Sequence, residues 1–175
     1  QGFGLSIDHG YFPFTTSRDT TAQSLFAGTG INPYGFDVEV IGVARAYPIR
    51  VGGNSGPFDS DSTELTWEQV AKRAGDKRDI SEKTSVTKTV RRVATFSWDG
   101  LKRACMINRP TEIALTFADH IDALVYERES LTSKVEDFIT RIEYASGIPV
   151  GIIKTGQNTT IDRDWYRGSM LRKIA

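Results

Sequence analysis

The stretch from Thr84 to Arg92 brings hydroxyl groups and cations together in one short segment. It reads Thr-Ser-Val-Thr-Lys-Thr-Val-Arg-Arg and holds three positive side chains. An arginine suits a carboxylate or a phosphate, because its planar guanidinium donates two parallel hydrogen bonds. The same pattern also fits an exposed strand with charged residues along its edge. An anion-binding loop and an edge strand therefore both stay open for this segment.

A second hydroxyl-rich segment, Gly10 to Thr21, comes just before a predicted short helix at residues 22–27. Hydroxyl groups and the free backbone N–H groups of a helix N-terminus can both donate to an anion. Threonine and serine are also the usual capping and turn residues. On this segment alone, capping is the favoured interpretation.

Asp119 follows a predicted buried strand, Thr111 to Ala118. Its carboxylate has the chemistry to accept two hydrogen bonds from the N1 and N2 groups of a guanine. An aspartate beyond a strand end is more often a turn or capping residue, and the pattern alone favours that role. The glycine-rich run Gly52 to Gly56 lacks the Gly-Lys-Ser/Thr continuation of a phosphate-binding loop, which favours a flexible turn.

The residues that most often bind metals or act as nucleophiles show no such pattern. His9 and His120 each stand beside an aspartate, but neither has metal-ligand spacing or a nucleophile positioned for it, so both are predicted to be structural. The single cysteine, Cys105, lies in an apolar stretch and indicates a buried, inert thiol. One cysteine also excludes a disulfide framework or a cysteine zinc site within this chain.

Apolar periodicity predicts the elements that must position these residues. Helices with capping residues at their ends are expected at 67–74, 98–108 and 133–146, and strands at 36–46 (continuing to 51), 111–118 and 148–153. Pro48 places the continuation of the first strand at an edge or bend. A helix followed by a buried strand, twice over, predicts an α/β fold with a mixed or largely parallel sheet flanked by helices.

Size and charge limit the class of protein. With 175 residues, 39% hydrophobic and 25% charged, the chain is expected to form one globular unit spanning residues 1–175. The 22 basic residues balance the 22 acidic ones, so no long-range field points to a nucleic acid or a membrane as a partner. No apolar run approaches the roughly 20 residues of a membrane span, and Gln1 to Asp8 have neither a basic region nor a signal-like core, so a cytoplasmic location is predicted.

The order of segments along the chain resembles the adenylosuccinate synthetase family. The matching segments are Gln1-Gly2, Asp8 to Ser17 with Thr20-Thr21, Tyr47 to Phe58, the loop ending Arg91-Arg92-Val93, Thr116 to Asp119, and Lys154-Thr155-Gly156. Single motifs are weak, but their shared order from Gln1 to about Gly156 is specific. The form Arg-Val-Gly-Gly-Asn-Ser-Gly is most similar to the shorter archaeal and phage branch, which includes phage enzymes acting on a guanine deoxynucleotide.

The resemblance implies a ligase that joins L-aspartate to carbon 6 of a purine nucleotide, either inosine monophosphate or deoxyguanosine monophosphate. A nucleoside triphosphate, GTP or ATP, first phosphorylates the 6-oxygen with Mg²⁺, and the aspartate amine then displaces that phosphate. By similarity, Gln1 and Thr16 contact the substrate nucleotide. The aspartate loop comprises Thr84, Ser85, Val86, Thr87, Lys88, Thr89 and Arg91, and the GTP-binding residues are Arg91, Asp119, Lys154, Thr155 and Gly156. The intact enzyme is expected to be a homodimer.

Three positions depart from the family pattern. Thr89 stands where many members carry an arginine, Lys88 replaces a glycine, and Phe117 occupies the place of a lysine that covers the guanine. A catalytically inactive nucleotide-binding or interaction module derived from this family is therefore the alternative.

The chain also resembles only the C-terminal half of a synthetase. Its start at Gln1, in a glycine-rich apolar segment, reads like a cut through an ordered core. The family's phosphate-binding loop, catalytic aspartate, general-acid histidine and magnesium contacts all precede the position of Gln1. No catalytic residue is therefore expected within these residues, and the isolated chain is expected to be inactive.

Overall fold

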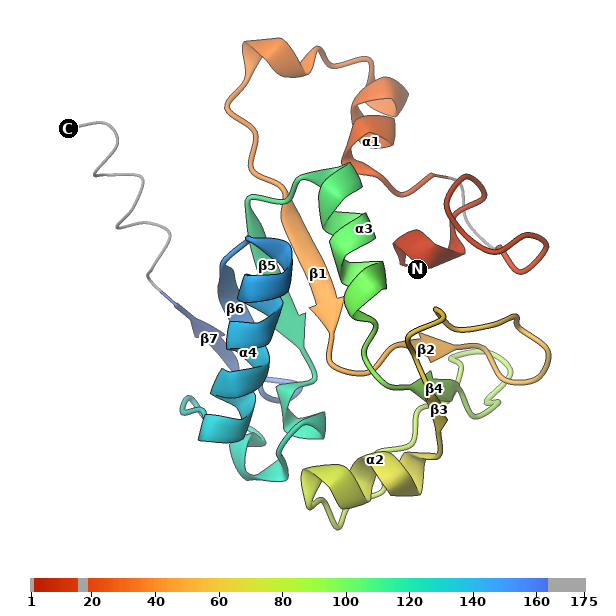
Figure 1. The fold of residues 1–175 in the computed structure, drawn as a ribbon, viewed down its shortest axis with the longest axis vertical. Helices are drawn as coiled ribbons and strands as arrows, with labels where there is room; N and C mark the ends of the chain where they lie inside the picture. The colour runs from red at the N-terminus through yellow and green to blue at the C-terminus, as the bar shows by residue number, and fades with distance from the viewer. Residues whose placement is uncertain (1, 16–18, 164–175) are drawn as a thin grey trace.

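A computed structural model describes residues 2–15 and 19–163, and Figure 1 shows its ribbon. A four-stranded sheet forms its centre, in the order β1-β5-β6-β7. Its strands are β1 (Ile41–Arg45), β5 (Glu112–Thr116), β6 (Val150–Lys154) and β7 (Thr160–Asp162). β1, β5 and β6 run parallel and β7 is antiparallel to β6. The predicted α/β fold with a mixed, largely parallel sheet is therefore confirmed.

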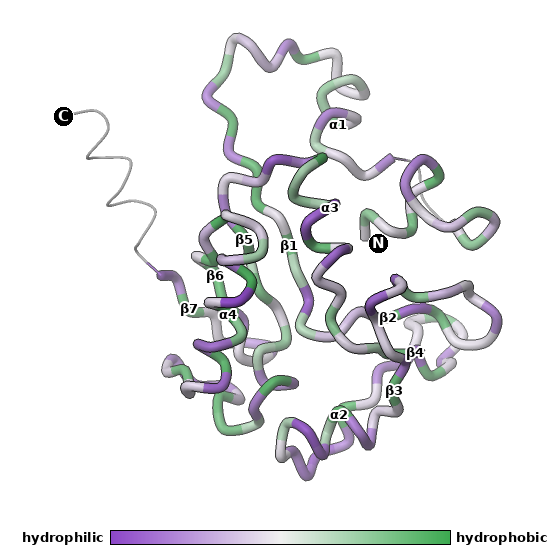
Figure 2. Tube along the Cα trace, viewed as in Figure 1, coloured by the Kyte–Doolittle hydropathy of each residue, from purple (hydrophilic) through white to green (hydrophobic). Residues whose placement is uncertain are grey.

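Two helices, α3 (Trp98–Asn108) and α4 (Ser133–Ser146), cover one face of this sheet (Figure 1). Ser97 caps α3 by accepting from the N–H of Gly100, and Gly147 ends α4 in the left-handed conformation. Ile139 and Ile142 of α4 are fully buried against Leu115 and other strand residues. Figure 2 shows the resulting pattern, with hydrophobic positions recurring through β5, β6 and α4.

A smaller antiparallel sheet stands beside the ends of the main strands. It has the order β2-β4-β3, formed by β2 (Ile49–Arg50), β4 (Arg92–Ala94) and β3 (Glu64–Leu65). Helix α2 (Trp67–Ala74) follows β3, and Thr66 and Gln69 form a reciprocal capping box at its start. Trp67 and Val70 are buried with Val93 in a second, small core.

The predicted strand at 36–51 is two strands instead of one. β1 ends at Arg45, the chain bends through Tyr47 and Pro48, and β2 then pairs with β4 in the other sheet. Pro48 has no N–H to donate to a neighbouring strand, so the bend occurs at the position that the sequence predicted.

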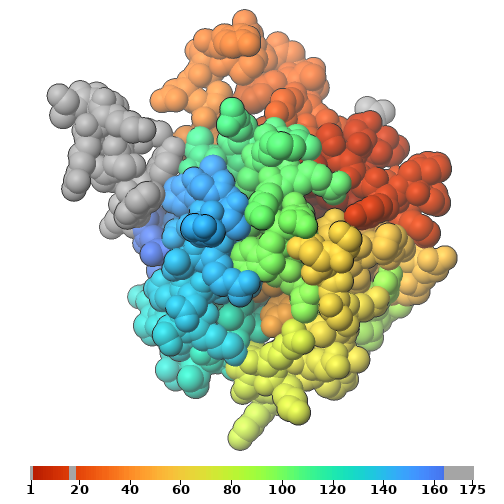
Figure 3. Space-filling model, in the orientation of Figure 1, coloured from red at the N-terminus to blue at the C-terminus, as the bar shows by residue number. Residues whose placement is uncertain are grey.

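The remaining helices are short. Helix α1 (Ala22–Thr29) and the turn η2 (Pro33–Gly35) belong to a segment that projects from the body of the molecule (Figure 3). Three further 3₁₀ turns are η1 (Phe3–Leu5), η3 (Ala118–His120) and η4 (Ala123–Val125). Within the described ranges, every helix is too short or too polar to cross a membrane.

Candidate functional site

The carboxyl ends of β1, β5 and β6 meet at one edge of the main sheet. The register pairs Arg45 with Thr116 and Leu115 with Ile153, so the three parallel strands end side by side. Asp119 follows β5 and Thr155 follows β6 at this edge. In open α/β sheets, ligands bind beyond the carboxyl ends of the strands, so this edge is the candidate site.

An open cleft of about 660 Å³ adjoins this edge, and three arginines line it. Arg45 ends β1, Arg50 ends β2, and Arg91 comes from the predicted aspartate loop. Arg45 forms an ion pair with Glu82, which also lines the cleft. Burial lowers the pKa of the Arg45 guanidinium despite this partner, but an arginine stays charged at any physiological pH. The cleft thus offers cations to an anionic ligand.

Arg50 is buried, with only 7% of its surface exposed. Its Nε donates to the carbonyl of Ser55 at 2.7 Å, and one Nη donates to the carbonyl of Phe14 at 3.1 Å. Burial lowers its pKa, and neighbouring Arg92 lowers it further. These carbonyls fix the guanidinium in place while leaving it without a carboxylate partner at ion-pair distance among the described side chains. It can therefore serve a negatively charged ligand in the cleft.

The sequence interpretation missed Arg45 and Arg50. A charged residue directly after the apolar strand 41–44 was the available signal for Arg45. Arg50 was included in the resemblance only as part of Tyr47 to Phe58. What distinguishes it from other arginines is its burial, which the sequence does not reveal.

Asp119 is buried at the strand edge, with 6% of its surface exposed. Its Oδ2 accepts a hydrogen bond from Nη2 of Arg78 at 3.2 Å. Burial raises the pKa of the Asp119 carboxyl, and the positive charge of Arg78 opposes that rise. The resemblance assigns this carboxylate to the donor base, and its cationic partner Arg78 was not predicted from the sequence.

The other expected base-binding residues follow β6. The Thr155 hydroxyl is fully buried and donates to the carbonyl of Arg128 at 2.8 Å, so it faces the protein. Lys154 donates from Nζ to the carbonyl of Gln157 at 3.1 Å. A Cβ added to Gly156 would come within 2.6 Å of the Glu127 side chain, so a larger residue would have to displace the carboxylate that accepts from the N–H groups of Gln157 and Asn158. Thr155 and Gly156 are thus available to a ligand mainly through their backbone.

The expected aspartate loop is the tip of a hairpin. An isolated bridge joins Lys83 to Val90, and the N–H of Thr84 donates to the carbonyl of Thr89 at 2.9 Å. The hydroxyls of Thr84 and Thr87 are 2.6 Å apart, and Thr89 donates to Thr87 at 3.2 Å. These three threonines close the tip on itself.

The rest of this hairpin divides between solvent and the cleft. Ser85, Val86 and Lys88 are exposed, and Lys88 has a positive φ of 56° in place of the family's glycine. Arg91 lines the cleft with Arg45. The structure therefore brings one of the seven predicted loop residues into the cleft and leaves the tip open to solvent.

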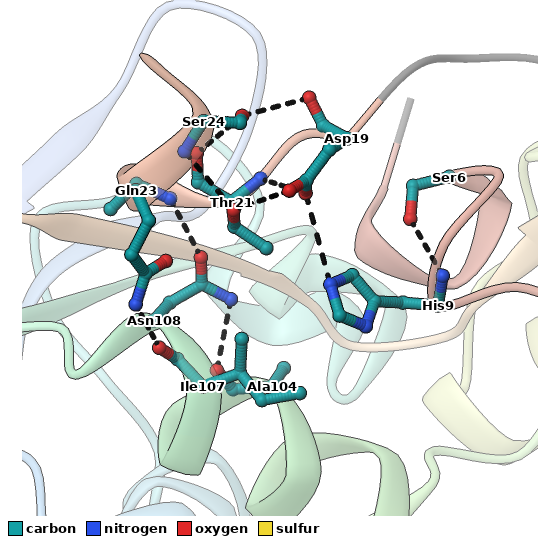
Figure 4. A network of polar contacts seen from close by, with 10 residues as sticks. Ser6, His9, Asp19, Thr21, Gln23, Ser24, Ala104, Ile107 and Asn108 are labelled. Atoms are coloured by element: carbon teal, nitrogen blue, oxygen red, sulfur yellow. Dashed lines mark hydrogen bonds and ion pairs between the residues drawn. The ribbon is translucent and has the colours of Figure 1, made fainter. Parts of the chain in front are cut away.

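Helix α1 begins in a polar network that Figure 4 shows. Asp19 accepts from the N–H and the hydroxyl of Thr21, both at 2.9 Å, and lies 3.8 Å from His9. The N–H of Ala22 donates to the Asn108 side chain from α3. Thr21 and Asn108 thus occupy the first N–H groups of the helix, as the capping interpretation requires. The predicted nucleotide contacts Gln1 and Thr16 lie outside the described residues.

The glycine-rich run 52–56, predicted to be a flexible turn, is tied to its neighbours. Arg92 donates to the Ser55 hydroxyl at 3.1 Å and to the Gly56 carbonyl at 2.8 Å. A Cβ on Gly52 would meet the carbonyl oxygen of Val90 at 2.5 Å. This close approach packs the run against the base of the hairpin.

No cluster of three or more His, Cys, Asp or Glu side chains that could hold a metal ion occurs among residues 2–15 and 19–163. Cys105 is half-buried on α3, and burial raises the pKa of its thiol, which disfavours a reactive thiolate.

Comparison with known proteins places this geometry in one family. The family model of adenylosuccinate synthetase matches residues 1–126. The adenylosuccinate synthetase of Methanosphaera stadtmanae is 41% identical over 167 residues, covering 93% of this chain and 46% of that protein. The N6-succino-2-amino-2'-deoxyadenylate synthase of Vibrio phage phiVC8 is 38% identical over 146 residues, covering 83% of this chain and 38% of that protein.

A solved structure agrees with these sequence matches. The succinoaminodeoxyadenylate synthetase of cyanophage S-2L, bound to dGMP and to dATP as an energy donor, superposes with a TM-score of 0.71 at 30% identity. The match covers 98% of this chain and 48% of the phage protein. The chain spans about half the length of the curated relatives it matches.

Proposed function

This chain belongs to the adenylosuccinate synthetase family, and we propose from that membership that it is the C-terminal part of a ligase joining L-aspartate to C6 of a 6-oxopurine nucleotide. The observation that supports this most directly is the shared edge of β1, β5 and β6. There the segments that we propose to bind the donor base, at Asp119 and at 154–156, follow strands that end beside Arg45, which lines the cleft.

The proposed reaction has two steps. GTP or ATP transfers its γ-phosphoryl group to the purine 6-oxygen, which turns that oxygen into a leaving group. The aspartate amine then attacks C6, the C–O bond breaks, and inorganic phosphate leaves as the amine loses a proton. The first step depends on positioning and charge neutralisation, for which Arg45, Arg50 and Arg91 offer cations.

Each segment of the site has a proposed role. Gln1 and Thr16 contact the substrate nucleotide, and the hairpin 84–91 closes over aspartate to keep water from the activated intermediate. Asp119, with the turn Lys154, Thr155 and Gly156, receives the donor base, while Arg91 reaches both ligands from the hairpin. Magnesium would enter with the donor phosphates, and its protein ligands are assigned to the half that precedes this chain. We also propose a homodimeric enzyme working in the cytoplasm.

The purine substrate is either inosine monophosphate or deoxyguanosine monophosphate. Both an archaeal adenylosuccinate synthetase and a phage N6-succino-2-amino-2'-deoxyadenylate synthase resemble the chain at about 40% identity. The departures at Lys88, Thr89 and Phe117 keep an inactive nucleotide-binding module as the second candidate.

The experiment that separates these candidates is an aspartate-dependent turnover assay on the intact parent protein, with each purine nucleotide, GTP or ATP, and magnesium. We expect a succinylated product from one purine, identified by mass spectrometry, and none when aspartate is left out. No product in any combination, from protein shown to be folded by circular dichroism, would overturn the ligase proposal and favour the inactive module.

A further inference from the structure

Arg78 is the cation that faces the buried carboxylate of Asp119, although no family motif includes it. We propose that Arg78 is a positioning residue for the donor base: it keeps Asp119 ionised and oriented so that this carboxylate can accept hydrogen bonds from the base. This inference rests on the proposed function, in which Asp119 reads the donor base.

The guanidinium of Arg78 is fixed on several sides. Its Nε donates to both carboxylate oxygens of Asp76, at 3.0 and 3.1 Å, and Nη2 donates to Oδ2 of the same residue. Asp76 in turn accepts from the backbone N–H of Arg78 at 2.8 Å. The ring of Tyr126 lies 3.4 Å from the Arg78 Cζ, in cation–π contact. A cation held this way needs little reordering when a ligand arrives.

Asp119 depends on this cation because it is buried. Only 9% of the Asp119 side chain is exposed, against 37% of the Arg78 side chain. A carboxylate taken out of water favours its neutral form, and a protonated carboxyl loses part of its capacity to accept. The N–H groups of a base need an acceptor, so the ionised form is the one that recognises them.

Geometry leaves room for a base on the same carboxylate. Arg78 uses Oδ2 of Asp119 through one hydrogen bond, whereas an ionised carboxylate offers about four acceptor positions. Arg78 therefore orients the group without saturating it. The contact spans 41 positions of sequence, which makes it a tertiary feature of the site.

The other charged or titratable groups around Asp119 come from several elements. They are Asp76 in the loop after α2, Arg45 on β1, Glu82 paired with Arg45, His120 beside Asp119, Asp122 after η3, and Tyr126 stacked on Arg78. Asp76 is itself paired with Arg78, and His120 is buried and neutral at pH 7. Among the residues that the structure describes, Arg78 is the cation at hydrogen-bond distance from Asp119.

The test compares Arg78→Gln with the unchanged intact enzyme at pH 6 and pH 8. We expect the KM for the preferred donor triphosphate to rise about tenfold at pH 6, with kcat nearly unchanged, because a charge-assisted contact that orients and ionises Asp119 is lost. The defect should be smaller at pH 8 than at pH 6, because burial raises the pKa of Asp119 and the loss of its cation matters more as the pH falls. Arg78→Lys should recover part of the affinity, since it restores the charge without the fork.

Lys77→Gln is the matched control, because Lys77 is the exposed cation next to Arg78 in the same loop. This variant should leave the donor KM unchanged at both pH values. A double variant tests the route of the effect: in an Asp119→Asn background, Arg78→Gln should add little to the loss. Circular dichroism checks that each variant is folded. If Arg78→Gln does not fold, Arg78→Lys takes its place in the same comparison.

Two failures are distinguishable. If the unchanged enzyme is active and Arg78→Gln keeps its donor KM at pH 6, this inference is wrong and the proposed function stands. A loss that is equal at both pH values and additive with Asp119→Asn would also overturn it. If the unchanged enzyme turns over no donor at all, the proposed function fails and this inference fails with it.

Discussion

His120 shows how the fold changes the chemistry of a single residue. It is 5% exposed, packs at 5.0 Å from Phe117 and 6.2 Å from Trp67, and its Nδ1 has no hydrogen-bond partner within the described residues. Burial, with a further effect of Arg45, lowers its pKa from 6.5 to about 4. The ring is therefore neutral at physiological pH and serves packing, the structural role that its sequence context favoured.

This depressed pKa predicts loss of stability in mild acid. Between pH 6.5 and about 4 the unfolded chain binds a proton at His120 that the folded chain does not. The free energy of unfolding therefore carries no penalty from His120 above pH 6.5, and it decreases as the pH falls from 6.5 toward 4. A shift of this size corresponds to about 3 kcal/mol in the free energy of unfolding. Urea denaturation from pH 7 to 4.5 should show that decline.

His120→Phe isolates the contribution of His120 from that of the carboxylates, because it keeps a ring and removes the titration. Its free energy of unfolding should fall less steeply with acid than that of the unchanged chain. His9→Phe, at the partly exposed histidine beside Asp19, is the control and should keep the steep decline. Equal slopes for His120→Phe and the unchanged chain would contradict the assignment.

Thr87 is the central residue of the threonine cluster at the hairpin tip. Its hydroxyl bonds with that of Thr84 and accepts from that of Thr89. Under the proposed function, Thr87→Val should raise the aspartate KM of the intact enzyme about tenfold. Without the hydroxyl bonds the loop is less ordered before aspartate binds, so part of the binding free energy is used to order it. Steady-state kinetics with varied aspartate measures this. Thr63→Val, the same substitution at an exposed threonine outside the hairpin, should change it little, and a similar loss in both variants would argue against the cluster.

At the scale of elements, α2 supports the hairpin that carries Arg91. The indole Nε1 of Trp67, at the start of α2, donates to the carbonyl of Arg91 at 2.8 Å. The capping box of Thr66 and Gln69 fixes that first turn. Thr66→Ala should therefore cost about 1 kcal/mol of unfolding free energy, the usual cost of a lost N-cap. Thermal or urea unfolding measures it.

Thr63→Ala is the control for this change, because Thr63 is an exposed threonine three positions earlier that bonds to Thr95 through its backbone N–H and not through its hydroxyl. It should stay within about 0.5 kcal/mol of the unchanged chain, as surface substitutions usually do. An equal loss in both variants would mean that the capping box contributes nothing specific.

The sequence predicted the helices better than the sheets, for a physical reason. The bounds of α2, α3 and α4 follow from local caps such as Thr66, Ser97 and Gly147, which the chain carries next to each helix. The small sheet joins β2, β4 and β3 from segments far apart in the chain, and no local pattern encodes that pairing. The sequence did not predict a role for Arg78 for the same reason, because its partner Asp119 lies 41 positions further along the chain.

The whole molecule leaves one side of its main sheet open. β1 is the edge strand and pairs only with β5 among the described strands. Ile41 and Val43 are 50% and 74% exposed on it. Further apolar side chains are exposed on the segment before β1, which Figure 3 shows projecting from the body: Leu25, Ile31, Tyr34 and Phe36. Parallel sheets are normally covered on both faces, so we expect a further layer of protein to pack on β1 and on the segment before it.

The part of the relatives that this chain does not span is the natural source of that layer, since the chain covers 46% of the Methanosphaera stadtmanae protein. If that part packs on β1, a charge at Val43 should disrupt the contact, because a lysine on an edge strand opposes pairing and is costly to bury. Under the proposed function, mixing this chain with a separately expressed N-terminal half of the intact enzyme should give a complex by analytical ultracentrifugation. Val43→Lys should weaken that complex at least tenfold.

Tyr144→Lys provides the matched control for this experiment. Tyr144 is 90% exposed, but it lies on α4, on the helix-covered face of the sheet. The same charge placed there should leave the complex unchanged, because that face already has its layer. Since Val43 also lines the arginine cleft, a complex that forms and survives Val43→Lys would mean that the missing layer packs elsewhere and that the cleft stays open on the β1 side. A complex lost only with Val43→Lys would show that assembly of the two halves closes the cleft, so that substrate binding and completion of the fold depend on one surface.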